Sequence, residues 1–154
     1  MKIDIQNNSH ANIIFNSNSV RVSIRGEHAY TVKWFCDDNF VGDMFLGGGN
    51  WGTYPLSIGN WKVEFWQDNN LVGACDNNLE ASDILIIANF NQSIPGKNFN
   101  IDSLITRANE IKEKYKCNVV YYFKNSERFN LGDIPTLKMN DEYEFKLIAE
   151  ETYG

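Results

Sequence analysis

The chain has 154 residues, of which 43% are hydrophobic and 14% aromatic, so it can bury a core and is not expected to be disordered. Its formal net charge of −6 argues against the broad basic surface that binding to nucleic acids and anionic membranes requires. No apolar run is long enough to span a membrane, and the first residues lack the apolar stretch of a signal peptide. The three cysteines are an odd number, which favours free thiols, and we expect a cytoplasmic protein.

Short β-prone runs separated by turns occupy residues 1–80. We expect strands at 2–6, 11–15, 20–25, 29–36, 40–46, 61–67 and 71–75. The run 20–25 alternates strictly, so that its hydrophobic residues face a core while Arg21, Ser23 and Arg25 face water. Strands at a spacing of about ten residues with turn residues between them predict an antiparallel β-sandwich of immunoglobulin-like size.

A glycine-rich stretch, residues 47–52, interrupts this pattern. It lacks the Lys-Ser/Thr pair that follows a phosphate-binding loop, and no helical pattern comes after it. We therefore interpret it as a tight loop between strands, in which glycine allows positive φ angles.

The pattern changes after residue 80, and we expect a second subdomain over 81–154. Residues 84–90 form a continuous apolar run, typical of a strand that is covered on both faces. A helix over 101–116 and a strand over 118–123 follow, which together predict a small parallel, Rossmann-like β–α–β unit. A loop over 124–140 and a further strand over 143–149 complete a mixed, α+β fold.

No complete catalytic constellation is present. The two histidines, His10 and His28, fall in predicted turns, and there is neither a paired-cysteine metal motif nor a nucleophile elbow. The acidic pair Asp37 and Asp38 is typical of a turn between strands. We expect no enzyme activity, no catalytic residue, no metal and no cofactor.

Aromatic residues are the best candidates for binding. Trp51 follows the glycines, and Trp66 is out of phase with the core-facing residues of its strand, so one or both can be exposed near Tyr54. Exposed aromatic rings stack on sugars or anchor protein interfaces. The alternative is that these rings pack in the core of the sandwich.

The loop before the helix offers a second set of candidates. It lies at the carboxyl end of a predicted parallel strand, which is where α/β folds bind ligands. Its polar members are Asn91, Ser93, Gly96, Lys97 and Asn98.

Five short segments occur in a characteristic order. They are residues 60–66 (NWKVEFW), 69–72 (NNLV), 78–81 (NLEA), 114–117 (KYKC) and 118–120 (NVV). This order resembles the N-terminal part of heptosyltransferase-like glycosyltransferases, which modify autotransporter proteins and also occur in bacteriophage genomes. The resemblance covers roughly residues 30–125. It implies a small all-β region followed by the first half of a two-domain, Rossmann-like transferase.

The family's catalytic features are not matched. The resemblance places the catalytic aspartate of a Gly-Asp pair in the loop after the first Rossmann strand, where this chain has Lys97. The family's sugar-nucleotide site lies mainly in the second Rossmann half, which this sequence does not contain. The resemblance therefore implies a shortened relative that recognises a partner without transferring a sugar.

Three functions follow as hypotheses. The first is a non-catalytic binding or assembly module that recognises a glycan or a protein surface through the aromatic, glycine-rich region. The second is a structural protein, such as a subunit of a phage particle assembled in the host cytoplasm, whose aromatic residues are buried between subunits of an oligomer. The third is half of a glycosyltransferase that works with a second chain.

Overall fold

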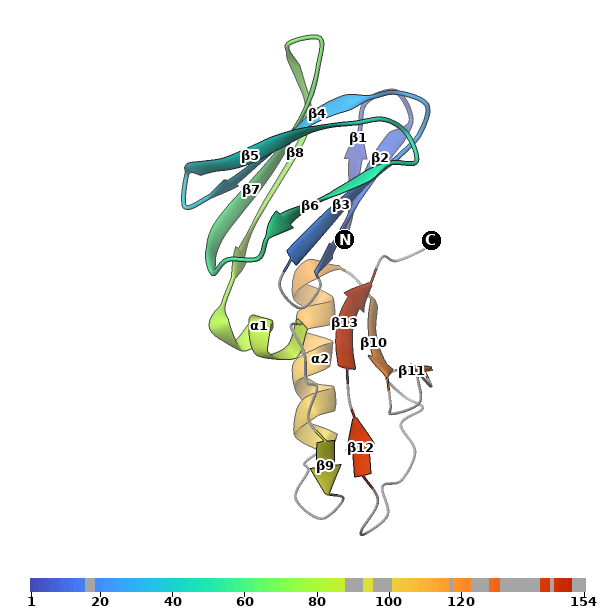
Figure 1. Cartoon of the computed structure of the whole chain (residues 1–154), viewed down its shortest axis with the longest axis vertical. Coiled ribbons are helices and arrows are strands. Elements are labelled where there is room, and N and C mark those ends of the chain that lie inside the picture. Colours follow the sequence, from blue (N-terminus) through green and yellow to red (C-terminus); the bar gives the residue numbers. More distant parts are fainter. Residues whose placement is uncertain are drawn as a thin grey trace.

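The fold is mainly antiparallel β, with few helices (Figure 1). The computed structural model describes the backbone of residues 1–15, 19–87, 93–95, 101–116, 118–122, 128–130, 142–144 and 146–150. It describes the side chains of residues 1–15, 19–84 and 106–116.

Two four-stranded antiparallel sheets form the upper part of the molecule in Figure 1 and face each other. The first sheet contains β1 (Lys2–Ile5), β2 (Ser9–Phe15), β3 (Ser19–Arg25) and β6 (Trp51–Pro55). The second contains β5 (Asn39–Leu46), β4 (Tyr30–Cys36), β7 (Gly59–Gln67) and β8 (Asn70–Leu79), in that order. Seven of these strands overlap the seven predicted for residues 1–80. The eighth, β6, was not predicted, and it begins inside the predicted glycine loop.

One core lies between the two sheets and follows from the two-residue period of the strands. The inward-facing residues Val20, Val22 and Ile24 of β3 are buried against the inward-facing residues of β4 and β7. A chain of aromatic contacts runs through this core. Its ring centroids are 5.3 Å apart for Tyr54 and Trp34, 5.0 Å for Trp34 and Trp61, 6.0 Å for Trp61 and Phe15, and 4.8 Å for Phe15 and Tyr115.

The acidic pair forms the predicted turn. Asp37 and Asp38 both have positive φ angles, 49° and 64°, between β4 and β5. The Asp37 carboxylate accepts a hydrogen bond of 2.9 Å from the backbone N–H of Asn60, which fixes the turn against the start of β7. A Cβ at Gly59 would lie 2.6 Å from that carboxylate, so the position requires glycine.

The strand predicted over 84–90 is wrong, because residues 81–87 form helix α1 (Ala81–Ile87); residues 88–90 lie outside the described part. Glu80 is the N-cap of this helix. Its carbonyl accepts from the backbone N–H of Ile84 (3.2 Å), and its own N–H donates to the Asp83 carboxylate (3.3 Å). A short apolar run does not by itself distinguish a buried strand from a buried helix.

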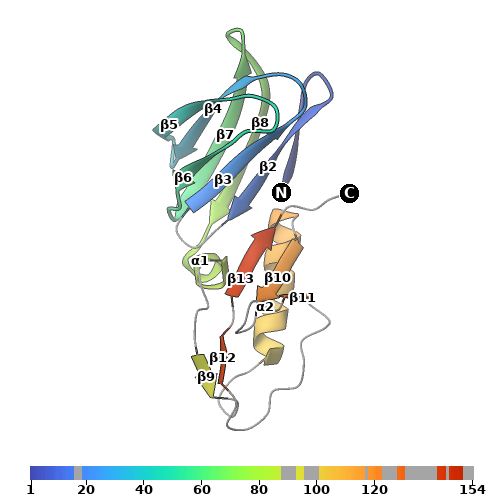
Figure 2. The same ribbon diagram turned by 45° about the vertical axis from the view of Figure 1, so that its right-hand side comes forward.

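The second part of the chain extends the first sheet. Helix α2 (Ile101–Tyr115) leads to β10 (Asn118–Tyr122), which pairs with β11 (Arg128–Asn130) and with β13 (Lys146–Glu150). Strand β13 pairs in turn with β2 through Ala149 and Phe15. Strands β9 (Ser93–Pro95) and β12 (Glu142–Glu144) pair separately, at the end of the molecule far from the two facing sheets (Figure 2).

Every strand pair among the described residues is antiparallel. The predicted parallel, Rossmann-like unit is therefore not found there, since its first strand is helix α1 and β10 pairs only with antiparallel neighbours. The helix over 101–116 is confirmed almost to the residue. The boundary at residue 80 coincides with the start of α1, although Ala108, Ile111 and Tyr115 of α2 belong to the same core as the two sheets.

None of the helices in the described ranges is long and apolar enough to cross a membrane.

Candidate ligand-binding faces

Trp51 is placed by a glycine turn that is anchored to the neighbouring strand. The Asn50 N–H donates to the carbonyl of Gly47 (3.0 Å), and the Gly49 N–H donates to the carbonyl of Ile24 (2.8 Å). Gly49 has a φ of +83°, which favours glycine at this position. The turn starts β6 in register with β3, so that Trp51 lies directly opposite Ser23.

We call the outward side of the first sheet the Trp51 face. By strand pairing and alternation it carries Lys2, Asp4, His10, Asn12, Ile14, Arg21, Ser23, Arg25, Trp51 and Thr53. Trp51 is 59% exposed, and the guanidinium carbon of Arg21 lies 5.5 Å from the centroid of its ring. This cation–π contact places the guanidinium on one side of the indole and leaves most of the side chain exposed.

A polar row runs across this face beside Trp51. Asn12 lies opposite Ser23, and Ser23 lies opposite Trp51. Both side chains are buried, Asn12 at 1% exposure, yet neither amide atom of Asn12 nor the Ser23 hydroxyl has a hydrogen-bond partner. Buried polar groups almost always have partners, and ordered water commonly supplies them. The burial of Ser23 also corrects the prediction that it faces water.

We call the outward side of the second sheet the Trp66 face. It carries Thr31, Lys33, Phe35, Phe40, Asp43, Phe45, Lys62, Glu64, Trp66, Leu71, Ala74 and Asp76. Trp66 is only partly exposed: its indole N–H donates to Glu64 (3.3 Å), and the Lys33 ammonium lies 4.7 Å from its ring centroid. Phe45, at 76% exposure, is the more accessible aromatic side chain of this face.

The predicted aromatic site is not one site. Trp51 and Trp66 lie on the outward sides of the two different sheets. Tyr54 is a core residue: it is buried, its ring stacks on Trp34, and its hydroxyl donates to the Val32 carbonyl (2.8 Å). Burial, with Asp43 nearby, raises the pKa of Tyr54. The Tyr54 ring is therefore not available to a surface ligand, because it is buried and its hydroxyl is hydrogen-bonded inside the protein.

The predicted loop site is separate again. Ser93 belongs to β9, which pairs with β12 and lies far from β6 and β7 in both views (Figures 1 and 2). Asn91, Gly96, Lys97 and Asn98 lie outside the described residues. The structure thus does not bring Ser93 together with either tryptophan.

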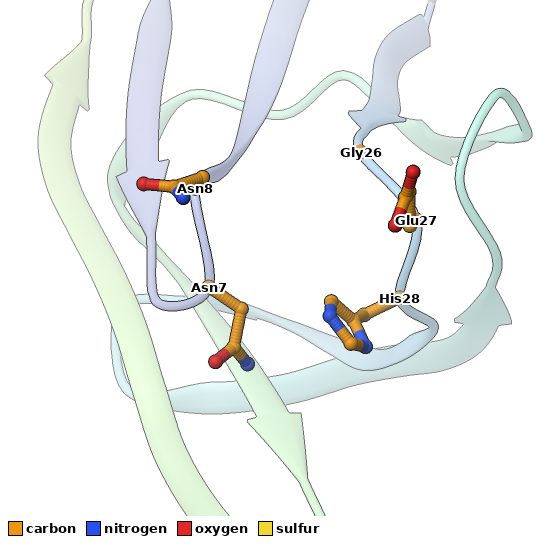
Figure 3. A pocket seen from close by; sticks show the side chains of 5 residues that line it. All are labelled: Asn7, Asn8, Gly26, Glu27 and His28. Atoms are coloured by element: carbon orange, nitrogen blue, oxygen red, sulfur yellow. The ribbon is translucent and has the colours of Figure 1, made fainter.

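A pocket of about 340 Å³ lies between the turn that joins β1 to β2 and the connection from β3 to β4, and it is lined by Asn7, Asn8, Gly26, Glu27 and His28. Figure 3 shows the side chains of Asn7 and His28 directed toward each other from opposite sides of it. The residues are exposed and polar, and no aromatic or apolar wall lines the pocket. Ligand pockets are predominantly apolar, so this pocket is a weaker candidate than the two faces.

A buried ionic cluster joins the two helices. The Asp83 carboxylate is fully buried and accepts hydrogen bonds from Arg107, from Lys114 (2.6 Å) and from the Tyr115 hydroxyl (2.9 Å). Burial by itself would raise the pKa of Asp83, but the bonds from Lys114, Tyr115 and the Glu80 backbone outweigh it and lower that pKa. A carboxylate held as an anion by so many donors has no capacity left for a substrate, so we assign the cluster a structural role.

No group of three or more potential metal ligands occurs in the part of the chain that the structure describes. Cys36 and Cys75 are free thiols. No protein-family model matches the chain, no curated protein matches its sequence, and no solved structure matches its fold. The resemblance to the glycosyltransferases accordingly stays a prediction.

The polar row beside Trp51 was missed by sequence reasoning. Its signal was Asn12, a polar residue inside the apolar run 11–15. Ser23 gave no comparable signal, because a serine that alternates with valines fits a water-facing position equally well.

Proposed function

We propose that this protein is a non-catalytic binding module that recognises a glycan through the Trp51 face. The observation that carries the proposal is the largely exposed ring of Trp51 on β6, the edge strand of the first sheet. The flat, amphipathic ring of tryptophan is suited to stacking on the apolar face of a sugar.

The polar row lies beside the ring that the sugar would stack on, and Ser23 is directly opposite Trp51 in the sheet. Leaving Ser23 and Asn12 buried and unpaired costs about 1–3 kcal/mol each, so ordered water in this row would stabilise the sheet that carries Trp51.

The resemblance to glycosyltransferases supports the choice of a glycan over other small molecules. The part of the resemblance that implies sugar transfer has less support, because helix α1 occupies the place of the first Rossmann strand and Lys97 stands where the family has its aspartate. We therefore do not favour a transferase half that works with a second chain.

Replacing Trp51 by Ala tests the proposal. We expect at least about a tenfold loss of affinity for any glycan that raises the melting temperature of the unmodified protein, because stacking on the ring is lost. The unfolding midpoint without ligand should change little, since the side chain is exposed. Glycan titrations followed by fluorescence and thermal shift measure both quantities.

Phe45→Ala is the matched control, because Phe45 is also an exposed aromatic residue but lies on the opposite sheet. Its glycan affinity should equal that of the unmodified protein. If Trp51→Ala bound glycan as well as Phe45→Ala does, the Trp51 face would not be the site.

Assembly through the Trp66 face is the second candidate function. Phe40, Phe45 and Leu71 are all exposed on β5 and β8, the two edge strands of that sheet. Exposed apolar side chains gathered on one face are typical of protein interfaces. The face carries two positive and three negative groups, so it offers both signs of charge to a second copy.

Phe45→Ser tests this candidate. If copies of the chain associate through the Trp66 face, the substitution should shift the native mass from an oligomer to a monomer, because the largest exposed apolar side chain of the face is removed. Native mass spectrometry over a concentration series measures the change, with Trp51→Ala as the variant that should leave assembly intact. A chain that is monomeric before substitution contradicts the assembly role.

A further inference from the structure

The charges of the first sheet are unevenly distributed. The whole chain has a net charge of −6, but among the described residues the Trp51 face carries Lys2, Arg21 and Arg25 against a single carboxylate, Asp4. With His10 neutral, the net charge of this face is +2. These three cations are most of the five Lys and Arg residues in positions 1–80. The Trp66 face, by contrast, has a net charge of −1.

Arg21 is the cation nearest to the aromatic ring. Its guanidinium lies over Trp51, and none of the described residues forms an ion pair with it. An arginine that stacks on an aromatic ring still presents N–H donors at the edge of its plane, and that fork matches a carboxylate or a sulfate. Lys2 lies at the other end of the polar row, opposite Asn12.

We propose that the Trp51 face selects an acidic glycan, one that carries uronate, sialate or sulfate groups. This inference rests on the proposed function. Trp51 stacks on a sugar ring, and Arg21 pairs with the acidic group that the sugar carries. Lys2 adds attraction from the far end of the row.

A glycan array tests this specificity with the full chain. The array presents uronate-containing, sialylated and sulfated oligosaccharides beside neutral oligosaccharides, together with polyglutamate as an anion that has no sugar. We expect binding to acidic glycans and at least about a tenfold weaker response to the methyl ester of a uronate ligand, in which the carboxylate charge is removed. Affinity for the acidic ligand should fall as salt rises.

Two variants separate charge from stacking. Arg21→Gln should remove the preference for the acidic ligand over its methyl ester and retain weak binding to both, whereas Trp51→Ala should lose both. Lys33→Gln is the matched control, because Lys33 also lies over a tryptophan, but on the Trp66 face. It should bind like the unmodified protein. Unfolding midpoints of all three variants confirm that they fold.

Each outcome distinguishes this inference from the function on which it rests. Binding to neutral glycans alone would overturn the acidic specificity and keep the glycan-binding module. If polyglutamate bound as tightly as the acidic glycans, and Trp51→Ala did not change its binding, the face would be only an anion-binding surface. That result would overturn both the acidic specificity and the glycan-binding function. An array without any signal would likewise overturn both.

Discussion

Replacing Trp61 by Ala is expected to lower the free energy of unfolding by about 3–5 kcal/mol, the usual cost of truncating a buried large aromatic residue. Trp61 is 2% exposed and is the middle of the aromatic chain, because its ring contacts both Trp34 of the second sheet and Phe15 of the first. The substitution leaves a large cavity between the sheets. Urea unfolding followed by circular dichroism measures the loss.

Trp61→Phe keeps the test informative if the alanine variant fails to fold. The indole N–H of Trp61 is buried without a partner, so phenylalanine removes an unsatisfied donor while keeping much of the apolar volume. We expect it to cost less than about 2 kcal/mol. Trp51→Ala, at an exposed position, should stay within about 0.5 kcal/mol of the unmodified protein. Similar losses for Trp61→Ala and Trp51→Ala would contradict the described core.

Replacing Asp83 by Asn is expected to cost about 3 kcal/mol, and about 10 °C in melting temperature, because it leaves the charges of Arg107 and Lys114 without their shared partner. We place the loss at the lower end of the range for breaking a buried ion pair. Arg107 and Lys114 remain 29% and 28% exposed, and water therefore relieves part of the cost. Differential scanning calorimetry at neutral pH measures it.

The pH dependence of the same variant identifies the charge as the cause. The pKa of Asp83 is lowered in the folded state, so the unfolded chain takes up the proton at higher pH than the folded chain does. The carboxylate therefore stabilises the fold above the ordinary aspartate pKa of about 4, and this contribution is lost as pH falls below it. The difference between the unmodified protein and Asp83→Asn should shrink below about pH 4.

Glu110→Gln is the control for the cluster. Glu110 also pairs with Arg107, at 2.6 Å, but its side chain is 56% exposed. Solvent-exposed ion pairs contribute about 0–1 kcal/mol, so the melting temperature should hardly change. A loss for Glu110→Gln as large as that for Asp83→Asn, or a pH-independent effect of Asp83→Asn, would contradict the assignment of the buried carboxylate as the centre of the cluster.

The candidate site was only partly predictable from the sequence. The sequence named Trp51 as a candidate for exposure, because glycines precede it, and left packing in the core as the alternative. The grouping of Trp51 with Tyr54 and Trp66 did not follow, because proximity in sequence does not say which sheet, or which side of it, a residue occupies. Trp51 and Tyr54 lie in the same strand, and alternation places one ring outside and the other in the core.

Local sequence patterns predict seven of the eight strands of the two facing sheets, most of the turns between them, and helix α2. These elements depend on local chemistry: a two-residue or 3.6-residue apolar period, and Asn, Asp and Gly residues that accept positive φ angles between strands. Such preferences act over a few neighbouring residues and can be read without knowing the fold.

Contacts between distant segments determine the helical state of residues 81–87 and which residues share each candidate face. The apolar residues of α1 fit either a strand or a helix, and Asp83, within the apolar stretch, is stabilised by Arg107, Lys114 and Tyr115, which are 24 to 32 positions away in sequence. The polar row depends on the register that aligns Asn12, Ser23 and Trp51 across three strands. Both features come from pairing distant segments, which no local pattern specifies.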